Sequence, residues 1–371
     1  MRDELERIAI PDADAASERA RAVVLAAFRE REPVTRPRRG RRVALGVVLA
    51  ACAVALAAAS PPGMAVVDRV REVVGIERSA PALFSLPAAG RLLVGSDAGV
   101  WVVDQDGSKR LLSGYREASW SPFGRFIVAT RRNELAALEP DGDVRWTLAR
   151  PGVAQARWGG TETDTRIAYA DRTGIRVVAG DGTGDRLLAP ADRAPFAWRP
   201  GARHVLAYVS ASELRVQDTD TGQVLWRGNR GLNAPVRALE WSDDGRRLLV
   251  LSPYGLRVYE GRGRLAVHRE APDAGRFTDA AFIPGTHRVV LLRNAGDVVY
   301  LDTQRTIFRG SGLASVIPSP TQGWLLVTWP RADQWVFVGS GGRLRATADV
   351  TDQFHSRSGF PRVEGWCCAK R

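Results

Sequence analysis

Apolar and polar positions along residues 80 to 350 repeat as a unit of about 39 residues, a period typical of solenoids and propellers. Each unit begins with a short strand that ends at a large apolar residue. A turn such as Ser-Pro-x-Gly at 121–124 and an unbroken apolar strand such as 126–129 follow. A third strand runs into a turn such as Asp-Gly, and a fourth strand comes after it. The seven first strands end at the anchors Phe84, Trp120, Trp158, Trp198, Trp241, Phe282 and Pro318.

Four short strands in each of seven units, with no helical segment between them, predict an all-β, seven-bladed β-propeller of four-stranded blades. Unbroken apolar strands such as 248–251 are typical of sheets that are covered on both faces, as neighbouring blades cover one another. The unit around Trp158 departs from the pattern, because Gly159, Gly160 and Thr161 replace Ser-Pro. Six regular blades plus a degenerate one is therefore an alternative.

The W-S-P-x-G element at Trp120, followed by an apolar run that ends in D-x-D-G, resembles the repeat of TolB-like, WD-repeat-like bacterial propellers. The resemblance covers roughly residues 80 to 350 and is more specific for fold than for function. It implies that a strand from one terminus completes the blade at the other. Trp366, in the sequence FPRVEGWCC, is then expected on the innermost strand of the first blade, because residues 83–86 make a poor first strand.

A different pattern precedes the repeat, because Val43 to Ala59 are 17 uncharged positions that would rise roughly 26 Å as a helix. Arginines lie before this run and Ser60-Pro61-Pro62-Gly63 follows it, so the positive-inside rule predicts an uncleaved signal anchor with a cytoplasmic N-terminus. The flanking arginines are Arg36, Arg38, Arg39, Arg41 and Arg42. We expect a cytoplasmic basic and helical segment at 1–42, a transmembrane helix at 43–60, a juxtamembrane helix and linker at 61–79, and an extracytoplasmic propeller at 80–371.

Three other interpretations of the apolar run remain open. Small residues at 57–60 would suit cleavage of a signal peptide, although the segment before the run is long for one. Leu49-Ala50-Ala51-Cys52 resembles a bacterial lipobox, although the residues after Cys52 stay apolar. A buried soluble helix is the third, and the arginines beside the run argue against it.

Two shorter helices are expected around the membrane segment. Small apolar side chains recur at helical spacing between Asp12 and Arg31, and Pro33 lies beyond them. So narrow a stripe cannot form its own core, and the helix either leads into the membrane or docks a cytoplasmic partner. Valines between 64 and 74 predict a helix at the membrane interface or under the propeller.

The net charge of +12 rests on 53 basic residues, of which only Lys109 and Lys370 are lysines. Such an arginine excess is typical of a GC-rich genome, and no basic helix, finger or aromatic RNA-binding pattern accompanies it. We expect no nucleic-acid partner.

Few residues indicate catalysis or metal binding. No nucleophile elbow, zinc, phosphate-loop or dinucleotide motif is present, so no catalytic, cofactor-binding or metal-binding residue is predicted. The four histidines, at positions 204, 268, 287 and 355, are expected to be ordinary surface residues. Asp218 to Gly222 looks like a calcium loop but lacks the distal glutamate, and a hairpin turn accounts for it.

Cys367 and Cys368 are adjacent and can form only a strained ring. We expect a structural pair at a strand end beside Trp366. Pairing with another chain or a redox role are the alternatives.

A second resemblance concerns DTDTGQVLWRG at 218–228, which is similar to the tryptophan-docking repeat of quinoprotein propellers. LEPDGDVRW, ending at Trp146, is a fainter copy. The family carries pyrroloquinoline quinone and needs the motif in most blades, together with cofactor and calcium ligands. A quinoprotein-type dehydrogenase is therefore a remote alternative.

These patterns together predict a non-catalytic, membrane-anchored scaffold whose propeller loops bind a protein, a peptide or an envelope polymer, with no cofactor. The 42 basic and 33 acidic residues after position 42 would suit anionic envelope material. Transmembrane signalling is the alternative, in which residues 12–31 hold a cytoplasmic regulator such as a sigma factor.

Overall fold

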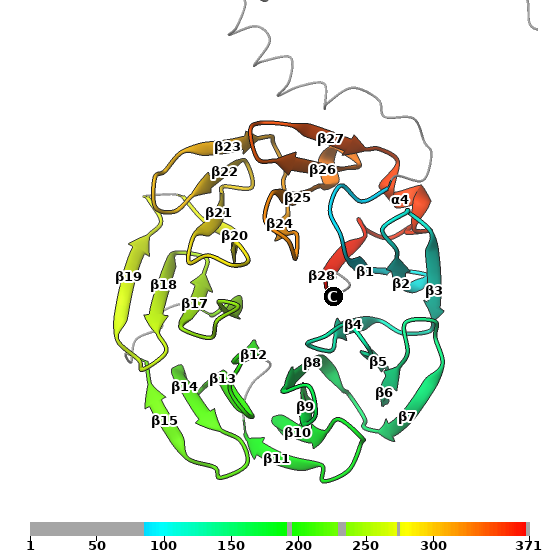
Figure 1. The fold of residues 1–371 in the computed structure, drawn as a ribbon, viewed down its shortest axis with the longest axis vertical. Helices are drawn as coiled ribbons and strands as arrows, with labels where there is room; N and C mark the ends of the chain where they lie inside the picture. The colour runs from blue at the N-terminus through cyan, green and yellow to red at the C-terminus, as the bar shows by residue number, and fades with distance from the viewer. Residues whose placement is uncertain (1–84, 191–194, 229–234, 273–274, 369–371) are drawn as a thin grey trace, which may run out of the picture. The chain divides into compact units, whose positions relative to one another are not determined.

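The computed structural model describes residues 85–190, 195–228, 235–272 and 275–368, which form seven antiparallel four-stranded sheets arranged as blades around one axis (Figure 1). The predicted all-β, seven-bladed propeller is confirmed, and the alternative with six regular blades is wrong. Phe84 and the segments predicted for residues 1–79 lie outside the described residues. Within the part of the chain that is described, no helix is long and apolar enough to cross a bilayer.

The strands of each blade follow one another outward from the axis. Blades 1 to 3 contain β1 (Arg91–Ser96), β2 (Gly99–Val103) and β3 (Lys109–Ser113); β4 (Glu117–Trp120), β5 (Ile127–Arg131), β6 (Glu134–Leu138) and β7 (Val144–Ala149); and β8 (Ala154–Gly160), β9 (Thr165–Ala170), β10 (Ile175–Ala179) and β11 (Arg186–Ala189). Blades 4 and 5 contain β12 (Phe196–Trp198), β13 (Val205–Ser210), β14 (Glu213–Asp218) and β15 (Val224–Arg227); and β16 (Ala238–Trp241), β17 (Arg247–Ser252), β18 (Gly255–Glu260) and β19 (Leu265–Glu270).

The last part of the chain builds two further blades and then returns to the first. Blades 6 and 7 contain β20 (Phe277–Phe282), β21 (Val289–Arg293), β22 (Asp297–Tyr300) and β23 (Thr306–Arg309); and β24 (Ser315–Pro318), β25 (Trp324–Trp329), β26 (Gln334–Gly339) and β27 (Leu344–Thr347). A 3-10 turn, η2 (Pro330–Ala332), joins β25 to β26, and a short helix, α4 (Val350–Gln353), follows β27.

The ring is closed by β28 (Arg362–Cys367), which pairs antiparallel with β1 and is the innermost strand of blade 1. Figure 1 shows this red C-terminal strand beside the cyan β1. In the register, Trp366 lies opposite Leu92 and Gly365 opposite Leu93, with an irregularity between Leu93 and Val94. The closing strand expected around Trp366 is therefore confirmed, and Ser85 and Leu86 belong to no strand.

Side-chain hydrogen bonds stabilise the turn between the first and second strands in blades 2 and 5. The Ser121 hydroxyl accepts a hydrogen bond from the Phe126 amide at 3.0 Å, and the Ser242 hydroxyl accepts one from the Arg247 amide at the same distance. Gly124 and Gly245 adopt φ values of 66° and 64°, a region that favours glycine because it has no Cβ. The serine side chain thus satisfies a turn amide that the hairpin leaves unpaired.

The hydrophobic core is divided among the interfaces between neighbouring blades and does not form one central cluster. In one cluster, Leu93 and Val102 of blade 1 pack against Trp120 and Ile127 of blade 2. Middle strands such as β13 and β26 are buried along their whole length, which is why their sequences do not alternate.

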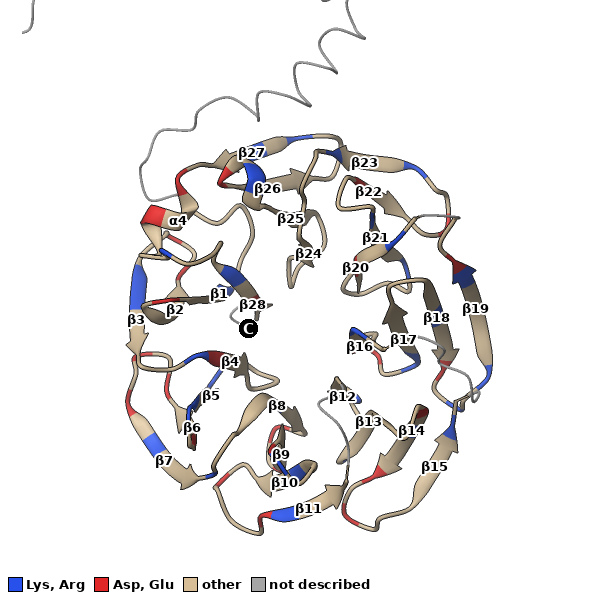
Figure 2. Cartoon of the chain, turned by 180° about the vertical axis from the view of Figure 1, so that it is seen from behind, with Lys and Arg blue, Asp and Glu red and all other residues tan. Residues whose placement is uncertain are grey.

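The outer strands are different, since each exposes a sheet edge to solvent. Every one of these seven strands carries at least one lysine or arginine, and Figure 2 marks these basic positions in blue around the perimeter. Charged side chains on edge strands oppose edge-to-edge pairing with other chains. Part of the basic excess therefore protects the outer edges of the ring.

Candidate interaction surfaces

The predicted blade anchors lie on the innermost strands. Trp120, Trp198, Trp241, Phe282 and Pro318 end β4, β12, β16, β20 and β24, while Trp158 lies within β8 and Trp366 within β28. All are buried except the half-buried Pro318. Two indoles reach the preceding blade, because Trp198 Nε1 donates to the Arg157 carbonyl at 2.9 Å and Trp241 Nε1 to the Ala197 carbonyl at 3.3 Å. Most of these residues serve contacts between blades, and only Trp158 and Pro318 also border a pocket described below.

Carboxylates on the innermost strands tie each of three blades to the next. Glu117 accepts a hydrogen bond from the Gln155 amide at 2.6 Å, Glu240 from the Phe282 amide at 3.1 Å, and Asp279 from the Val316 amide at 2.9 Å. Each donor lies on the innermost strand of the following blade, where the inward edge of the sheet has no neighbouring strand. No sequence pattern indicated these contacts, although Glu117 and Asp279 both stand three residues before an anchor.

Burial raises the pKa of two of these carboxyl groups. It raises the pKa of Glu240 to about 8, opposed by the hydrogen bond from Phe282 and reinforced by the nearby carboxylates of Asp279 and Asp243. It also raises the pKa of Asp279 to about 6, opposed by the amides of Val316 and Ala280. Burial disfavours the charged form of a carboxyl group, so Glu240 is largely protonated at neutral pH.

Tryptophans on two fourth strands make matching contacts with the next blade. Trp146 Nε1 donates to the Gly180 carbonyl at 2.9 Å, and Trp226 Nε1 donates to the Gly261 carbonyl at 3.0 Å. Each ring lies against a turn glycine, and a Cβ added at Gly182 or at Gly263 would come within 2.9 Å of it. The two segments that resemble the tryptophan-docking repeat therefore share one inter-blade contact.

His204 corrects the expectation that all four histidines are surface residues. Its side chain is fully buried between blades 3 and 4. Its Nε2 lies 3.3 Å from Asp164 Oδ1, and its Nδ1 contacts the Asp220 carboxylate. Both ring nitrogens are engaged, so the arrangement ties the β8–β9 turn to the β14–β15 turn. In the second of these, Asp218 Oδ1 accepts the amides of Asp220 and Thr221, as expected for a hairpin turn.

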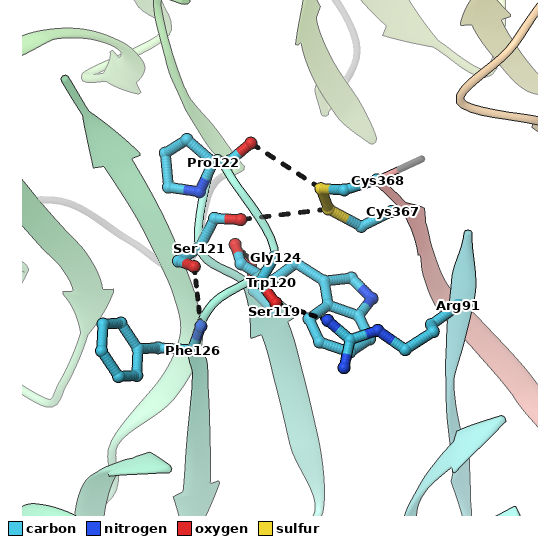
Figure 3. Close-up of a disulfide and its surroundings, with 9 residues drawn as sticks. All are labelled: Arg91, Ser119, Trp120, Ser121, Pro122, Gly124, Phe126, Cys367 and Cys368. Carbon is cyan, nitrogen blue, oxygen red and sulfur yellow. Dashed lines mark hydrogen bonds between the residues drawn. A yellow bond between two sulfur atoms is a disulfide. The ribbon is translucent and has the colours of Figure 1, made fainter. Parts of the chain in front are cut away.

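Cys367 and Cys368 are joined by a disulfide at the end of the closing strand (Figure 3). The pair packs on the β4–β5 turn of blade 2, where a Cβ added at Gly124 would lie 3.1 Å from the Cys368 side chain. On the other side of this turn, Arg91 donates to the Gly124 carbonyl at 2.5 Å, and its guanidinium lies 4.7 Å from the centre of the Trp120 ring. The expected strand-end pair is thus an intrachain disulfide that helps to join blade 1 to blade 2.

Two faces of the ring carry loops. The turn face is formed by the turns between first and second strands and between third and fourth strands. The connection face is formed by the turns between second and third strands and by the links between blades. Among the described residues, no group of three His, Cys, Asp or Glu side chains is placed to hold a metal ion.

The turn face has pockets between neighbouring blades. One of about 470 Å³ lies between blades 2 and 3, where Phe126, Trp158 and Arg166 are among its walls. Another of about 350 Å³ lies between blades 6 and 7, beside Tyr300, Trp324 and Pro318. Pro318 is the one predicted anchor that borders this second pocket.

The connection face has a smaller pocket of about 270 Å³ between blades 2 and 3. Its walls include Arg116, Arg131, Arg132 and Arg172. No sequence pattern singled these residues out, because the four arginines come from three separate segments that share no motif.

Comparison with known proteins identifies the fold and no closer relationship. No family model matches the chain, and no curated protein matches it. The Swd1 propeller domain of Myceliophteria thermophila is similar with a TM-score of 0.54 and 14% identity, over 73% of this chain and 97% of that one. The C-terminal WD40 domain of Sif2 gives a TM-score of 0.52 and 15% identity, over 69% and 80%. A chain in the mitotic checkpoint complex gives 0.51 and 14%, over 74% and 87%. The chain has a WD40-like, seven-bladed propeller fold.

Proposed function

We propose that this chain is a non-catalytic scaffold that binds another protein through the loops of its propeller, tethered at the outer side of a membrane by residues 43–59. The observation that carries the proposal is that buried and half-buried side chains connect each of several blades to the next. Carboxylates, indoles and the buried His204 all serve these contacts. Loops on such a frame are held in place and can present a fixed surface to a partner.

Similarity to a component of a protein assembly supports a protein-binding role. One similar chain lies within the mitotic checkpoint complex, which is an assembly of proteins. The fold hosts many functions, so this likeness supports the proposal without deciding it.

One observation supports a location outside the cytoplasm. The cluster of arginines at 36–42 precedes the apolar run, as the positive-inside rule requires for this orientation. Alkaline phosphatase fused after residue 371 should be active, and the same enzyme fused after residue 40 should be inactive. The reverse pattern would contradict the proposed orientation.

Protein binding can be tested with a photo-crosslinking phenylalanine analogue placed in the full-length chain in cells. Suitable positions are Phe123 on the turn face, Tyr254 on the connection face and Leu187 on the perimeter, whose exposed fractions are 37%, 53% and 45%. We expect a discrete crosslinked protein from at least one face and none from Leu187. The absence of a discrete product from both faces would count against the scaffold.

A further inference from the structure

Three segments of the connection face converge on the 270 Å³ pocket between blades 2 and 3. The Arg116 amide donates to the Thr130 carbonyl at 2.8 Å, which holds the start of blade 2 against its β5–β6 turn. The Arg150 amide donates to the Asn133 carbonyl at 2.8 Å, and the Gly152 amide donates to the Arg132 carbonyl at 3.3 Å. Backbone hydrogen bonds therefore fix the segments from which the arginines project.

Arg172 reaches the same pocket from the β9–β10 turn of blade 3. Its side chain lies along Gly152, since a Cβ added there would be 3.2 Å from Arg172 Cγ and 3.3 Å from Nε. Gly152 has a φ of 76°, so both its conformation and this close approach favour glycine. The glycine leaves room for the arginine at the rim of the pocket.

Basic side chains outnumber acidic side chains around the pocket. Arg131 is paired with Glu134 at 3.0 Å, and Glu117, which also lines the pocket, is bound to the Gln155 amide. Arg116, Arg132 and Arg172 are exposed, and none pairs with an acidic side chain among the described residues. Three guanidinium groups that form no ion pair thus surround one pocket, and the single Glu117 carboxylate offsets only part of their positive charge.

We propose that this arginine pocket binds the carboxylates of an acidic peptide segment of the partner protein. The inference rests on the proposed scaffold function and names the chemistry of its binding site. Arginine is suited to carboxylates because its planar N–H groups can make two parallel hydrogen bonds. The arginines come from three segments, and the pocket volume of about 270 Å³ is larger than one compact anion needs. This spacing suits several carboxylates along a peptide better than one phosphate.

A labelled hexaglutamate peptide and the full-length protein provide the test, read by fluorescence anisotropy. We expect wild-type protein to bind hexaglutamate and not hexaglutamine. The variant R132A/R172A should bind about tenfold more weakly, because exposed ion pairs each contribute modestly. Binding should also weaken when the ionic strength rises from about 0.05 to about 0.5 M, since salt screens exposed charges.

The matched control is R110A/R345A, which removes the same charge from the exposed perimeter on β3 and β27. It should bind hexaglutamate within about twofold of wild type, because these arginines lie outside the pocket. Equal weakening by both double variants would show an effect of net charge alone and overturn the proposal. So would unchanged binding by R132A/R172A, or tighter pocket-dependent binding of polyphosphate than of hexaglutamate.

The crosslinking experiment separates this proposal from the broader one. A partner captured equally by wild type and by R132A/R172A would overturn the arginine pocket and leave the scaffold function standing. Hexaglutamate binding that is weakened in R132A/R172A, without any crosslinked protein, would support the arginine pocket and count against the scaffold function.

Discussion

Single carboxyl groups on the innermost strands illustrate how much one side chain can contribute to a propeller. Glu240 and Asp279 lie on adjacent blades, and each accepts an amide hydrogen bond from the blade that follows. Their neighbours on the strand point into the apolar contacts between blades, so solvent reaches these groups only in part. Burial at this position disfavours the charged form of each carboxyl group.

Glu240 should therefore make stability depend on pH. Its pKa in the folded chain is about 8, above the roughly 4.3 of an unfolded glutamate, so the folded state holds the extra proton between these values. The free energy of unfolding should fall as pH rises through this interval. E240Q keeps a carbonyl acceptor for the Phe282 amide and should reduce the fall in Tm between about pH 5 and pH 8.

The matched control for this prediction is E260Q. Glu260 pairs with Arg264 at the surface, and that hydrogen bond lowers its pKa. Its removal should not reduce the fall in Tm between the same two pH values. If E240Q and wild type show the same slope, Glu240 does not hold a proton in the folded chain.

Prediction of individual residues from the sequence failed where the role of a side chain depends on its burial. His204 stands just before a second strand, a position that says nothing about burial, and the carboxylates around it come from turns 40 and 16 residues away. Glu117 and Asp279 share their offset from an anchor, but Glu240 stands one residue before Trp241 and breaks that pattern. Contacts between blades join residues that no local pattern relates.

Elements were more predictable than residues, because a repeat offers many copies of the same signal. The unbroken apolar run at 248–251 predicts a middle strand, and β17 covers it. A fourth strand is predicted after the turn that ends each third strand, and Trp146 and Trp226 lie on such strands, β7 and β15. The sequence did not reveal that both indoles dock on a turn of the next blade, because that turn lies about one repeat further along the chain.

The docking of Trp226 on the β18–β19 turn can be isolated by G263A. Gly263 has a φ of 91°, and an added Cβ would lie 2.9 Å from the indole of Trp226. Gly342 holds the corresponding place in the β26–β27 turn with a φ of 79°, and nothing lies within 4 Å of its added Cβ. Both substitutions should cost roughly 1 kcal/mol for backbone conformation, and G263A should cost about 1–3 kcal/mol more through the clash.

Urea unfolding of the two variants measures this difference directly. The tryptophan emission of the folded chain should also change in G263A, where the substitution disturbs Trp226, and stay unchanged in G342A. Equal destabilisation by both substitutions would mean that the indole moves away from the turn at no cost, and that its contact does not hold blades 4 and 5 together.

At the scale of the whole molecule, the ring depends on a strand that comes from the far end of the chain. The order of blades followed from the repeat, because each unit is local in sequence. Closure could not be derived from the periodicity, since β28 lies outside the repeated units and pairs with β1 from the other end of the propeller sequence, with Arg91 opposite Cys367. The resemblance to propellers with a completing terminal strand supplied that step.

Removal of residues 362–371 should therefore open the ring at a defined place. Blade 1 would lose its innermost strand, and Leu92, Val94 and the neighbouring Phe337 would lose the cover of Trp366. Hydrogen exchange should show loss of protection first in β1 and in the neighbouring strands β4 and β24, with blades 3 to 5 affected least. A synthetic peptide of residues 361–368 should restore protection in β1, because it can pair in the same register. A peptide with Trp366 replaced by aspartate should fail to restore it, since the indole lies among apolar side chains. Equal exchange in all blades after the truncation would show that the ring unfolds as one unit, and that β28 is required for the whole fold rather than for its seam.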